Sequence, residues 1–333
     1  MIELDGSDAG GQMVRTAAAL SALTGKSFSI SNIRGARPEP GLKIQHIEGV
    51  RSIAELCNAK VDGLSVGSRQ MEFAPGKLEP KDIDIGISTA GSIGLVLQAL
   101  AIVSPGLKDH IHVTFNGGGT WNQWAPPVIY LEKVLGHFLG EIIAVKIERD
   151  GFYPQGGAKV KCIIEPYEKA DINVLELGKV EKIEVYSVAS EQLKKGKVAE
   201  RQAEEAKRLL MEKLQAPVAT NVSYSKSLSP GSGLMIRIIT ENSVLGADAL
   251  GERGKTSEDV ASEAVKNAVA ELNGAVDRHA ADMILPFMAL SGGAIRTSQI
   301  TQHCMTNIAV IEKFLPVKFK IEGEKGGPGI IRI

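Results

Sequence analysis

His303 stands at the start of a predicted apolar helix, in the run Thr301-Gln302-His303-Cys304-Met305-Thr306-Asn307-Ile308. Apolar residues recur at helical spacing through Ile311 and Leu315, which predicts a core-facing stripe. An imidazole at a helix start meets the positive end of the backbone dipole, an effect of roughly 0.3–1 kcal/mol that disfavours the imidazolium form. A neutral imidazole keeps a lone pair and can attack phosphorus. The same placement also suits a helix cap or a packed side chain, so other residues must decide whether His303 has a catalytic or a structural role.

A glycine-rich loop near the amino end could hold phosphate. The segment Leu4–Arg15 follows a predicted strand, contains Gly10-Gly11 and opens a predicted helix, where bare amides attract anions. Asp8 could give a hard oxygen to a divalent metal, and Arg15 could reach phosphate oxygens from the first turns. The loop is neither a Walker loop nor a dinucleotide fingerprint. A tight turn with a surface aspartate explains the pattern equally well.

Two further segments have distinctive spacing. Arg34 and Arg37 lie in a loop that Pro38 and Pro40 stiffen, so their guanidinium groups form a pre-arranged pair suited to phosphate. The segment Arg149–Val160 contains several glycines and a proline, and this pattern favours a structural turn that leads into a strand.

Composition narrows the class of protein. A chain of 333 residues predicts about two domains, and 44% hydrophobic residues allow a sizeable core. Aromatic residues make up 5% and the net charge is −1, which argues against a long, sequence-blind nucleic-acid groove but not against binding of one strand end. The three cysteines, Cys57, Cys162 and Cys304, are too far apart for a C-x-x-C site, so we expect neither disulfides nor structural zinc. Early acidic residues exclude a secretory signal, and no stretch is long enough to cross a membrane, so we expect a soluble cytoplasmic protein.

Strand patterns alternate with helical patterns almost throughout, which predicts an α/β (α+β) fold. Helices are predicted at 12–23, 42–57, 92–103, 126–139, 256–272 and 280–290, and strands at 2–4, 26–33, 71–74, 82–88, 110–115, 142–148, 158–165, 218–224, 234–240, 317–321 and 329–333. A charged stretch around residues 194–208, with alanines on one side, predicts a solvated helix. The composition changes near Gly178, so we predict a smaller α/β domain at 178–274 inserted in a large domain of 1–177 plus 275–333.

Taken together, these segments resemble the RNA 3′-terminal phosphate cyclase family. The stretch 149–160 resembles the signature of that family, and Gln302–Ile308 resembles the segment that holds its nucleotidylated histidine. Further matches occur in the same order: Gly10-Gly11-Gln12, the Arg34/Arg37 loop, Ser88–Ser92 through Gln98, and Ala125-Pro126-Pro127. The resemblance runs nearly end to end. It implies a large domain of three repeated strand–helix units, similar to enolpyruvyl transferases, with a smaller inserted α/β domain.

The resemblance also implies a three-step reaction with ATP as substrate and Mg or Mn as the divalent metal. The histidine takes AMP from ATP, the AMP passes to the 3′-terminal phosphate of RNA, and the 2′-hydroxyl then displaces AMP to leave a 2′,3′-cyclic phosphodiester. In this scheme His303 is catalytic, Asp8 holds the metal, and Arg34, Arg37 and Gln45 bind the RNA phosphate. The resemblance assigns the ATP site to Arg15, Gln98, Pro126, Pro127, His279, Ala280, Ala281, Asp282 and Met283.

The chain departs from the usual family pattern at the acidic residue of the first loop, where Asp8 replaces glutamate, and at His279, where a tyrosine is common. Two alternatives stay open. One is a non-catalytic relative that acts in ribosome assembly, against which His303 argues; the other is an enolpyruvyl transferase of small metabolites. The sequence leaves monomer and homodimer equally open.

Overall fold

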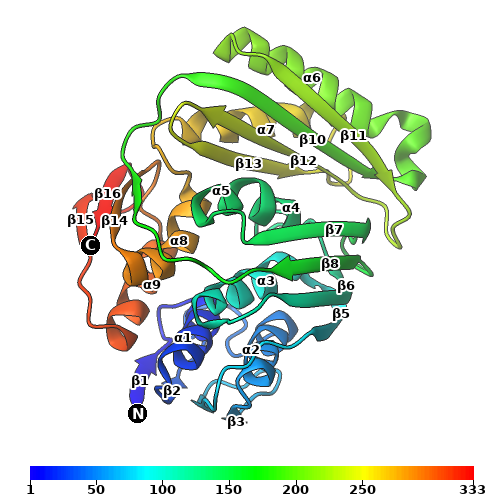
Figure 1. The fold of residues 1–333 in the computed structure, drawn as a ribbon. Helices are drawn as coiled ribbons and strands as arrows, with labels where there is room; N and C mark the ends of the chain where they lie inside the picture. The colour runs from blue at the N-terminus through cyan, green and yellow to red at the C-terminus, as the bar shows by residue number, and fades with distance from the viewer.

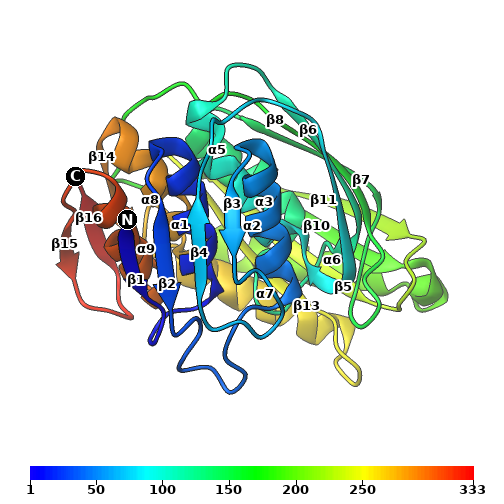
Figure 2. The same cartoon turned by 90° about the horizontal axis from the view of Figure 1, so that it is seen from below.

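The computed structural model describes residues 1–333 and contains four four-stranded sheets and nine α-helices (Figure 1). The first sheet has the strand order β1-β2-β4-β3, with β1 and β2 parallel and the other pairs antiparallel. Its elements are β1 (Ile2–Asp5), α1 (Gly11–Thr24), β2 (Phe28–Ser31), α2 (Ile44–Leu56), β3 (Lys60–Asp62) and β4 (Met71–Ala74). Figure 2 shows this sheet in front of α1 and α2, so both helices cover the same face.

The second sheet has the order β5-β6-β8-β7, again with only its first pair parallel. Its elements are β5 (Ile83–Ser92), α3 (Ile93–Ile102), β6 (Ile111–Gly119), the helical run of α4 (Val128–Tyr130), η2 (Leu131–Leu135) and α5 (Gly136–Leu139), then β7 (Ile143–Arg149) and β8 (Lys159–Ile164). The helix expected at 126–139 is therefore present, but it begins after Pro127 and has π-helical hydrogen bonding through η2.

The third sheet closes the chain and has the order β15-β16-β14-β9. Its elements are β9 (Ile172–Val174), α8 (Arg278–Ser291), β14 (Gly293–Thr297), α9 (Gln302–Phe314), β15 (Lys320–Gly323) and β16 (Gly329–Arg332). The three sheets share one strand order when the four strands of each are numbered along the chain. Strand one pairs in parallel with strand two, and strand four lies between strands two and three. The threefold repeat implied by the sequence stays an inference, which these matching strand orders support.

The fourth sheet lies within the chain between β9 and α8 and has the order β11-β10-β12-β13. Its strands are β10 (Val180–Ser190), β11 (Val218–Ser225), β12 (Ser232–Thr240) and β13 (Val244–Leu250). The helices α6 (Val198–Leu214) and α7 (Ser257–Glu271) pack on the sheet (Figure 1), and a separate cluster of 16 buried apolar residues fills the space between them. The prediction of an inserted domain at 178–274 stays a prediction, but this separate sheet and core favour it.

Local sequence explains where several helices begin and end. Gly25 ends α1 in the left-handed conformation that glycine adopts without strain. Thr256 and Asp259 form the expected capping box at the start of α7, and the hydroxyl of Ser92 accepts a hydrogen bond from Leu95 N at the start of α3. No helix of the structure is both long and apolar enough to span a bilayer.

The main core contains 69 buried apolar residues and anchors the helix that holds His303. Phe314, at the end of α9, packs edge-on against Phe28 of β2 with ring centroids 5.9 Å apart, and Phe28 stacks on Phe73 of β4 at 5.7 Å. Lys26 also donates a hydrogen bond of 2.6 Å to the carbonyl of Phe314. These contacts fix α9 against the first sheet and beside α1, with which it packs closely.

Candidate active site

His303 is the second residue of α9, in its first turn as expected. Thr301 caps the helix, since its hydroxyl accepts a hydrogen bond of 3.0 Å from Cys304 N. His303 is exposed to solvent, whereas Cys304 beside it is buried, and burial raises the pKa of the Cys304 thiol to about 12. A thiol with that pKa holds its proton at neutral pH, so the histidine is the available nucleophile of this turn.

Gln12 connects His303 to Asp282 across three helices. Its side chain lies in the first turn of α1 and is only 5% exposed. The amide Oε1 contacts Nδ1 of His303, and the amide Nε2 donates a hydrogen bond of 2.5 Å to Oδ2 of Asp282 on α8. The two ends of one glutamine amide are therefore both engaged.

This arrangement selects one tautomer of the neutral imidazole. Because Nε2 of Gln12 donates to the Asp282 carboxylate, its Oε1 faces Nδ1 of His303 and can only accept. Nδ1 of His303 must then carry the proton. Nε2 of His303 keeps its lone pair, on the side of the ring away from Gln12.

Partial burial and nearby positive charge keep the His303 ring neutral. The pKa of His303 is lowered by partial burial of the ring, by Arg15 and by Arg37. An added Cβ at Gly10 would lie 3.6 Å from both Nη2 of Arg37 and Cε1 of His303, so both side chains flank this glycine. Arg15 is 5% exposed and its stem packs on Gly49 of α2. Burial lowers the pKa of Arg15 to about 10 although Asp282 opposes the shift, so Arg15 remains a cation at neutral pH.

The buried polar network continues behind Gln12. Burial raises the pKa of Asp282 to about 7, although Gln12 and Arg15 stabilise the ionised form. Nδ2 of Asn307 donates a hydrogen bond of 2.8 Å to the backbone carbonyl of Asp282, and Oδ1 of Asn307 accepts one of 2.9 Å from Thr16. The helices α1, α8 and α9 are thus tied together directly beneath the imidazole.

A second histidine, His46, packs on the glycine loop without an open lone pair. Its ring is 4% exposed and fills the space where Gly11 would carry a Cβ. Nδ1 of His46 accepts a hydrogen bond of 3.0 Å from Lys43 N, so its Nε2 holds the proton. Burial, together with Arg15, Arg34 and Lys43, lowers the pKa of His46 to about 2. His46 is therefore neutral and acts as packing, which explains the need for glycine at position 11.

His279 lies in the first turn of α8, where Asp277 caps the helix. Oδ1 of Asp277 accepts hydrogen bonds of 2.9 Å from the backbone amides of His279 and Ala280, and one of 2.6 Å from the hydroxyl of Tyr130. The Tyr130 and His279 rings meet edge to face at 6.4 Å. Burial, then Arg278 and His303, lowers the pKa of His279 to about 4, so this ring is also neutral.

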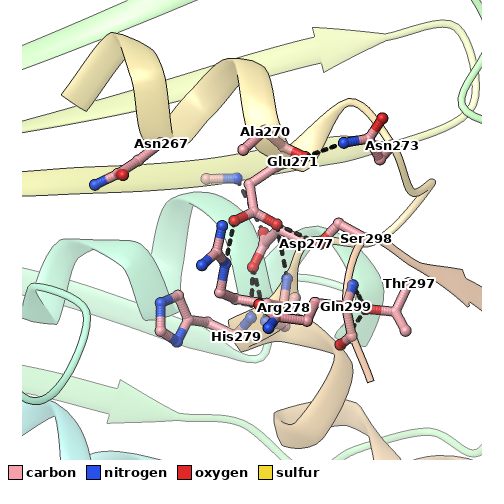
Figure 3. Close-up of polar contacts among 12 residues, drawn as sticks. Asn267, Ala270, Glu271, Asn273, Asp277, Arg278, His279, Thr297, Ser298 and Gln299 are labelled. Atoms are coloured by element: carbon pink, nitrogen blue, oxygen red, sulfur yellow. Dashed lines mark hydrogen bonds and ion pairs between the residues drawn. The ribbon is translucent and has the colours of Figure 1, made fainter. Parts of the chain in front are cut away.

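Figure 3 shows the surroundings of Asp277, where α7 meets the start of α8. The carboxylate of Glu271, at the end of α7, accepts three hydrogen bonds. The donors are Nε of Arg278, the hydroxyl of Ser298 and, at 3.0 Å, the backbone amide of Arg278. The His279 ring points away from this cluster. The cluster therefore fixes the start of α8 and leaves the imidazole of His279 free of it.

The two arginines of the proline-containing loop have different surroundings. Arg34 has a positive φ of 55°, and its Nη1 donates hydrogen bonds of 2.8 Å to the carbonyls of Glu39 and Gly41. Part of its guanidinium is thus used to shape its own loop. Arg37 is exposed and makes no side-chain hydrogen bond or ion pair. Arg37 is the arginine that remains available to an anion beside His303.

The other residues expected at the site lie on adjoining elements. Oε1 of Gln45 accepts a hydrogen bond of 3.2 Å from Ser92 N, which links the start of α2 to the start of α3. Gln98 is 7% exposed on α3. Pro126 and Pro127 are buried just before α4, and the Pro126 carbonyl would lie 3.3 Å from a Cβ at Gly94 of α3. Ala280, Ala281 and Met283 are buried on α8 with Asp282.

Asp8 is exposed, and its carboxylate makes no hydrogen bond or ion pair with the protein. Asp5, three residues earlier, accepts hydrogen bonds from Ser7 and Asn32 that fold its own turn. No group of three histidine, cysteine or acidic side chains gathers in a way that would enclose a metal ion. Asp8 is therefore the free carboxylate of the loop, and it would need ligands from elsewhere to complete a metal shell.

Three features of the site were not predicted from the sequence: the link from Gln12 to Asp282, the packing of His46 on Gly11, and the hydrogen bond from Tyr130 to Asp277. One available signal was the position of Gln12, a polar side chain in the first turn of a helix, followed at once by Met13 and Val14. A buried glutamine needs partners for both ends of its amide.

Comparisons with known proteins agree along the whole chain. A family model described as RNA 3′-terminal phosphate cyclase matches residues 7–321. An RNA 3′-terminal phosphate cyclase of Thermococcus kodakarensis is 44% identical, with 100% of this chain and 98% of the relative covered. Proteins with the same description from Saccharolobus solfataricus and Methanopyrus kandleri are 39% and 36% identical, with at least 97% of each chain covered.

Proposed function

Because the chain belongs to the RNA 3′-terminal phosphate cyclase family, a family of enzymes, we propose that it uses ATP to convert the 3′-terminal phosphate of RNA into a 2′,3′-cyclic phosphodiester. The reaction has three displacements at phosphorus. The first two attach AMP to the terminal phosphate, a poor electrophile, and so give it a good leaving group; dividing the activation through a covalent adenylate is the usual benefit of nucleophilic catalysis.

His303 is the proposed nucleophile of the first displacement. Its Nε2 attacks the α-phosphorus of ATP, a P–N bond forms, the bond to pyrophosphate breaks, and AMP remains on the imidazole. The observation that carries this proposal is the hydrogen-bonded chain Asp282–Gln12–His303, which leaves Nε2 of the exposed His303 with its lone pair. The lowered pKa of His303, caused by partial burial, Arg15 and Arg37, supports the neutral form that attack requires.

The second and third displacements transfer and release AMP. A 3′-phosphate oxygen of RNA attacks the phosphorus of the adenylate, the P–N bond breaks and the imidazole is regenerated. The adjacent 2′-hydroxyl then attacks the 3′-phosphorus, loses its proton, and AMP departs. Arg37 is free and lies beside His303, so it suits the terminal phosphate. Arg34, whose guanidinium shapes its own loop, and Gln45 are the other side chains proposed to bind the RNA phosphate.

The nucleotide is proposed to lie between α8 and the start of α4. Pro126, Pro127 and His279 would bound the base, with Gln98, Ala280, Ala281 and Met283 behind it. The burial of Pro126, Pro127 and Gln98, and the edge contact between the rings of His279 and Tyr130 at 6.4 Å, support a largely apolar surrounding for the base. Arg15 and Asp282 would face the phosphate side.

Asp8 is the proposed metal ligand. Magnesium or manganese often binds through one carboxylate together with substrate phosphates and water, so a single free carboxylate fits a site that the triphosphate completes. When bound, the ion would neutralise the triphosphate and polarise its α-phosphate. Asp8→Asn should therefore raise the metal concentration needed for self-adenylation, whereas Asp5→Asn should alter the turn without that change.

Incubation with α-labelled ATP tests the proposal. Wild-type protein should acquire acid-labile label at His303, which mass spectrometry would locate, and subsequent addition of 3′-phosphorylated RNA should discharge the label and yield a 2′,3′-cyclic end. His303→Ala should acquire none. His112→Ala is a suitable control, because His112 is exposed on β6 outside the site. Absence of any adduct in the wild type, with ATP and metal saturating, would favour a non-catalytic relative.

A further inference from the structure

Two exposed aromatic side chains stand at the tips of neighbouring turns. Trp124 is 84% exposed, in a turn that the backbone pairing of Asn122 with Ala125 closes. Tyr153 is 81% exposed, in a turn closed by the pairing of Phe152 with Gly156. In contrast, Trp121 is 3% exposed and packs on Gly233. Large aromatic surfaces in water on two adjacent turns are unusual in a chain with so few aromatics.

The two turns are fixed to each other. Thr120 N donates a hydrogen bond of 3.0 Å to the carbonyl of Gly151, and the Thr120 hydroxyl donates one of 2.7 Å to the buried carboxylate of Asp150. The carbonyl of Gly118 packs so closely on Gly151 and Gly156 that a Cβ at either glycine would lie within 2.6 Å of it. The aromatic rings therefore stand on a rigid support, which lowers the ordering cost of binding.

This support adjoins the proposed active site. Nδ2 of Asn122, in the Trp124 turn, donates a hydrogen bond of 2.9 Å to the carbonyl of Ala90. Two residues later Ser92 N binds Gln45. The chain from Trp124 continues through Pro126 and Pro127 to Tyr130, whose ring meets His279. These contacts join the Trp124 turn to the segments that hold Gln45 and His279, two residues of the proposed site.

A group of lysines lies on segments that adjoin the Tyr153 turn. Gln155 N and Asp150 N donate hydrogen bonds of 3.1 and 2.8 Å to Ser229 and Ser225, which brings the 225–231 loop against the Tyr153 turn. Lys226 lies in that loop, and Gln192 of the preceding helical turn binds its Ser227 carbonyl at 3.4 Å. The lysines of this group are exposed and form no ion pair: Lys194, Lys195, Lys197 and Lys226. Glu191 and Glu200 lie among them, and the Glu200 carboxylate accepts a hydrogen bond from Tyr224.

We propose that Trp124 and Tyr153 stack on nucleobases of single-stranded RNA just upstream of its 3′-terminal phosphate, while the lysine group attracts the backbone. This inference rests on the proposed function, because it extends the RNA site outward from His303. Exposed aromatics beside unpaired cations are the usual platform for single strands, and stacking tolerates any base. With two platforms, the footprint covers a few bases rather than a long groove, in keeping with the net charge of −1.

The test compares cyclisation of a 3′-phosphorylated dinucleotide with that of a 3′-phosphorylated octanucleotide. In the wild type, the KM of the longer RNA should be lower. Trp124→Ala and Tyr153→Ala should each raise the KM of the octanucleotide by about tenfold or more, with little change in kcat or in the KM of the dinucleotide. Trp124→Phe and Tyr153→Phe should restore most of the affinity. Met211→Ala, which truncates an apolar side chain 51% exposed on α6, serves as the matched control.

Self-adenylation separates this inference from the proposed function. It is measured with ATP alone, and both alanine variants should form the adenylate at the wild-type rate. An unchanged ratio of the two KM values in both variants would overturn the stacking proposal while leaving the cyclase proposal intact. A higher KM for ATP in Trp124→Ala would also overturn it for that residue and assign the indole to the adenine. Failure of the wild type to form an adenylate would instead refute the proposed function.

Discussion

Replacing Gln12 by methionine would test whether the glutamine positions the nucleophile. Methionine has a similar length and can occupy the same buried space, but it offers neither the acceptor for Nδ1 of His303 nor the donor for Asp282. His303 would then be free to rotate and to place its proton on either nitrogen. The Asp282 carboxylate would lose the one side-chain hydrogen bond that it accepts.

The structure sets the size of the expected effect. Loss of one hydrogen bond of net value about 0.5–1.5 kcal/mol corresponds to a decrease of about 2- to 13-fold in the rate of self-adenylation. The unpartnered Asp282 should cost a further 1–3 kcal/mol, roughly, in the free energy of unfolding. The second cost depends on pH, because burial raises the pKa of Asp282 to about 7 and the carboxyl can become neutral just below that pH.

Single-turnover formation of the adenylate, with ATP saturating, measures the first effect, and thermal unfolding measures the second. Gln202→Met is the matched control. Gln202 is also buried, and its amide is hydrogen-bonded at both ends, to Ser187 at 3.0 Å and to Ser232 at 2.9 Å, but it lies on α6, which packs on the fourth sheet. This variant should lose stability without slowing the adenylation of folded protein. Nitrogen NMR of labelled histidine should find the proton of His303 on Nδ1 in the wild type and shared between both nitrogens in Gln12→Met. Full-rate adenylation by Gln12→Met would refute the positioning argument.

Two further expectations follow from the charges around the site, and a third from Asp248, a carboxyl of β13 in the fourth sheet. Arg37→Ala should still accept AMP but cyclise RNA poorly. Arg34→Ala should slow both steps, because the Arg34 side chain holds its own loop in shape. Equal loss of AMP uptake and of cyclisation in Arg37→Ala would contradict these separate roles. Partial burial, Arg15 and Arg37 lower the pKa of His303 below 6.5, so the half-maximal rate of self-adenylation on acidification should lie below pH 6.5. A half-maximal rate above that pH would count against the neutral nucleophile. Burial raises the pKa of Asp248 from 3.8 to about 7, so ionisation of this carboxyl lowers the free energy of unfolding as the pH rises between those two values. Asp248→Asn should therefore raise Tm more at pH 8 than at pH 5. An equal gain in Tm at both pH values would contradict the shift.

The long periodic elements were predictable from sequence, whereas several strands were not. The helices at α1, α2, α3 and α7 lie within about two residues of their expected bounds, because capping residues and apolar spacing define them locally. β9 has three residues and pairs only with β14, so nothing local distinguishes it from a loop. β13 is rich in glycine and alanine, residues with low strand propensity. The Tyr130 ring packs against Gly246 so closely that a side chain there would clash with it. β10 was also not predicted, although its sequence carried a strand signal, since Ile183 and Val185 alternate with charged residues.

The candidate site was predictable in its residue types but not in its connections. His303 could be singled out from its place at a helix start, yet the dipole is only one influence on its pKa. The structure adds partial burial and two arginines, of which Arg15 is 288 positions away in the sequence (303 − 15). The contacts Gln12–His303 and Gln12–Asp282 join residues 291 and 270 positions apart. No spacing rule reaches over such intervals, because they depend on how α1, α8 and α9 pack.

Comparison of the three histidines near the site explains why a lowered pKa does not by itself identify the nucleophile. His46, His279 and His303 each lie in the first turn of a helix, and all three have pKa values below 6.5. His46 uses its Nδ1 lone pair on a backbone amide and buries the rest of its ring against Gly11, while the His279 ring lies against Tyr130. Only His303 combines exposure with an acceptor at Nδ1 that leaves Nε2 open. The shift makes all three rings neutral, and the hydrogen-bond partner then determines which of them presents a lone pair to an incoming phosphate.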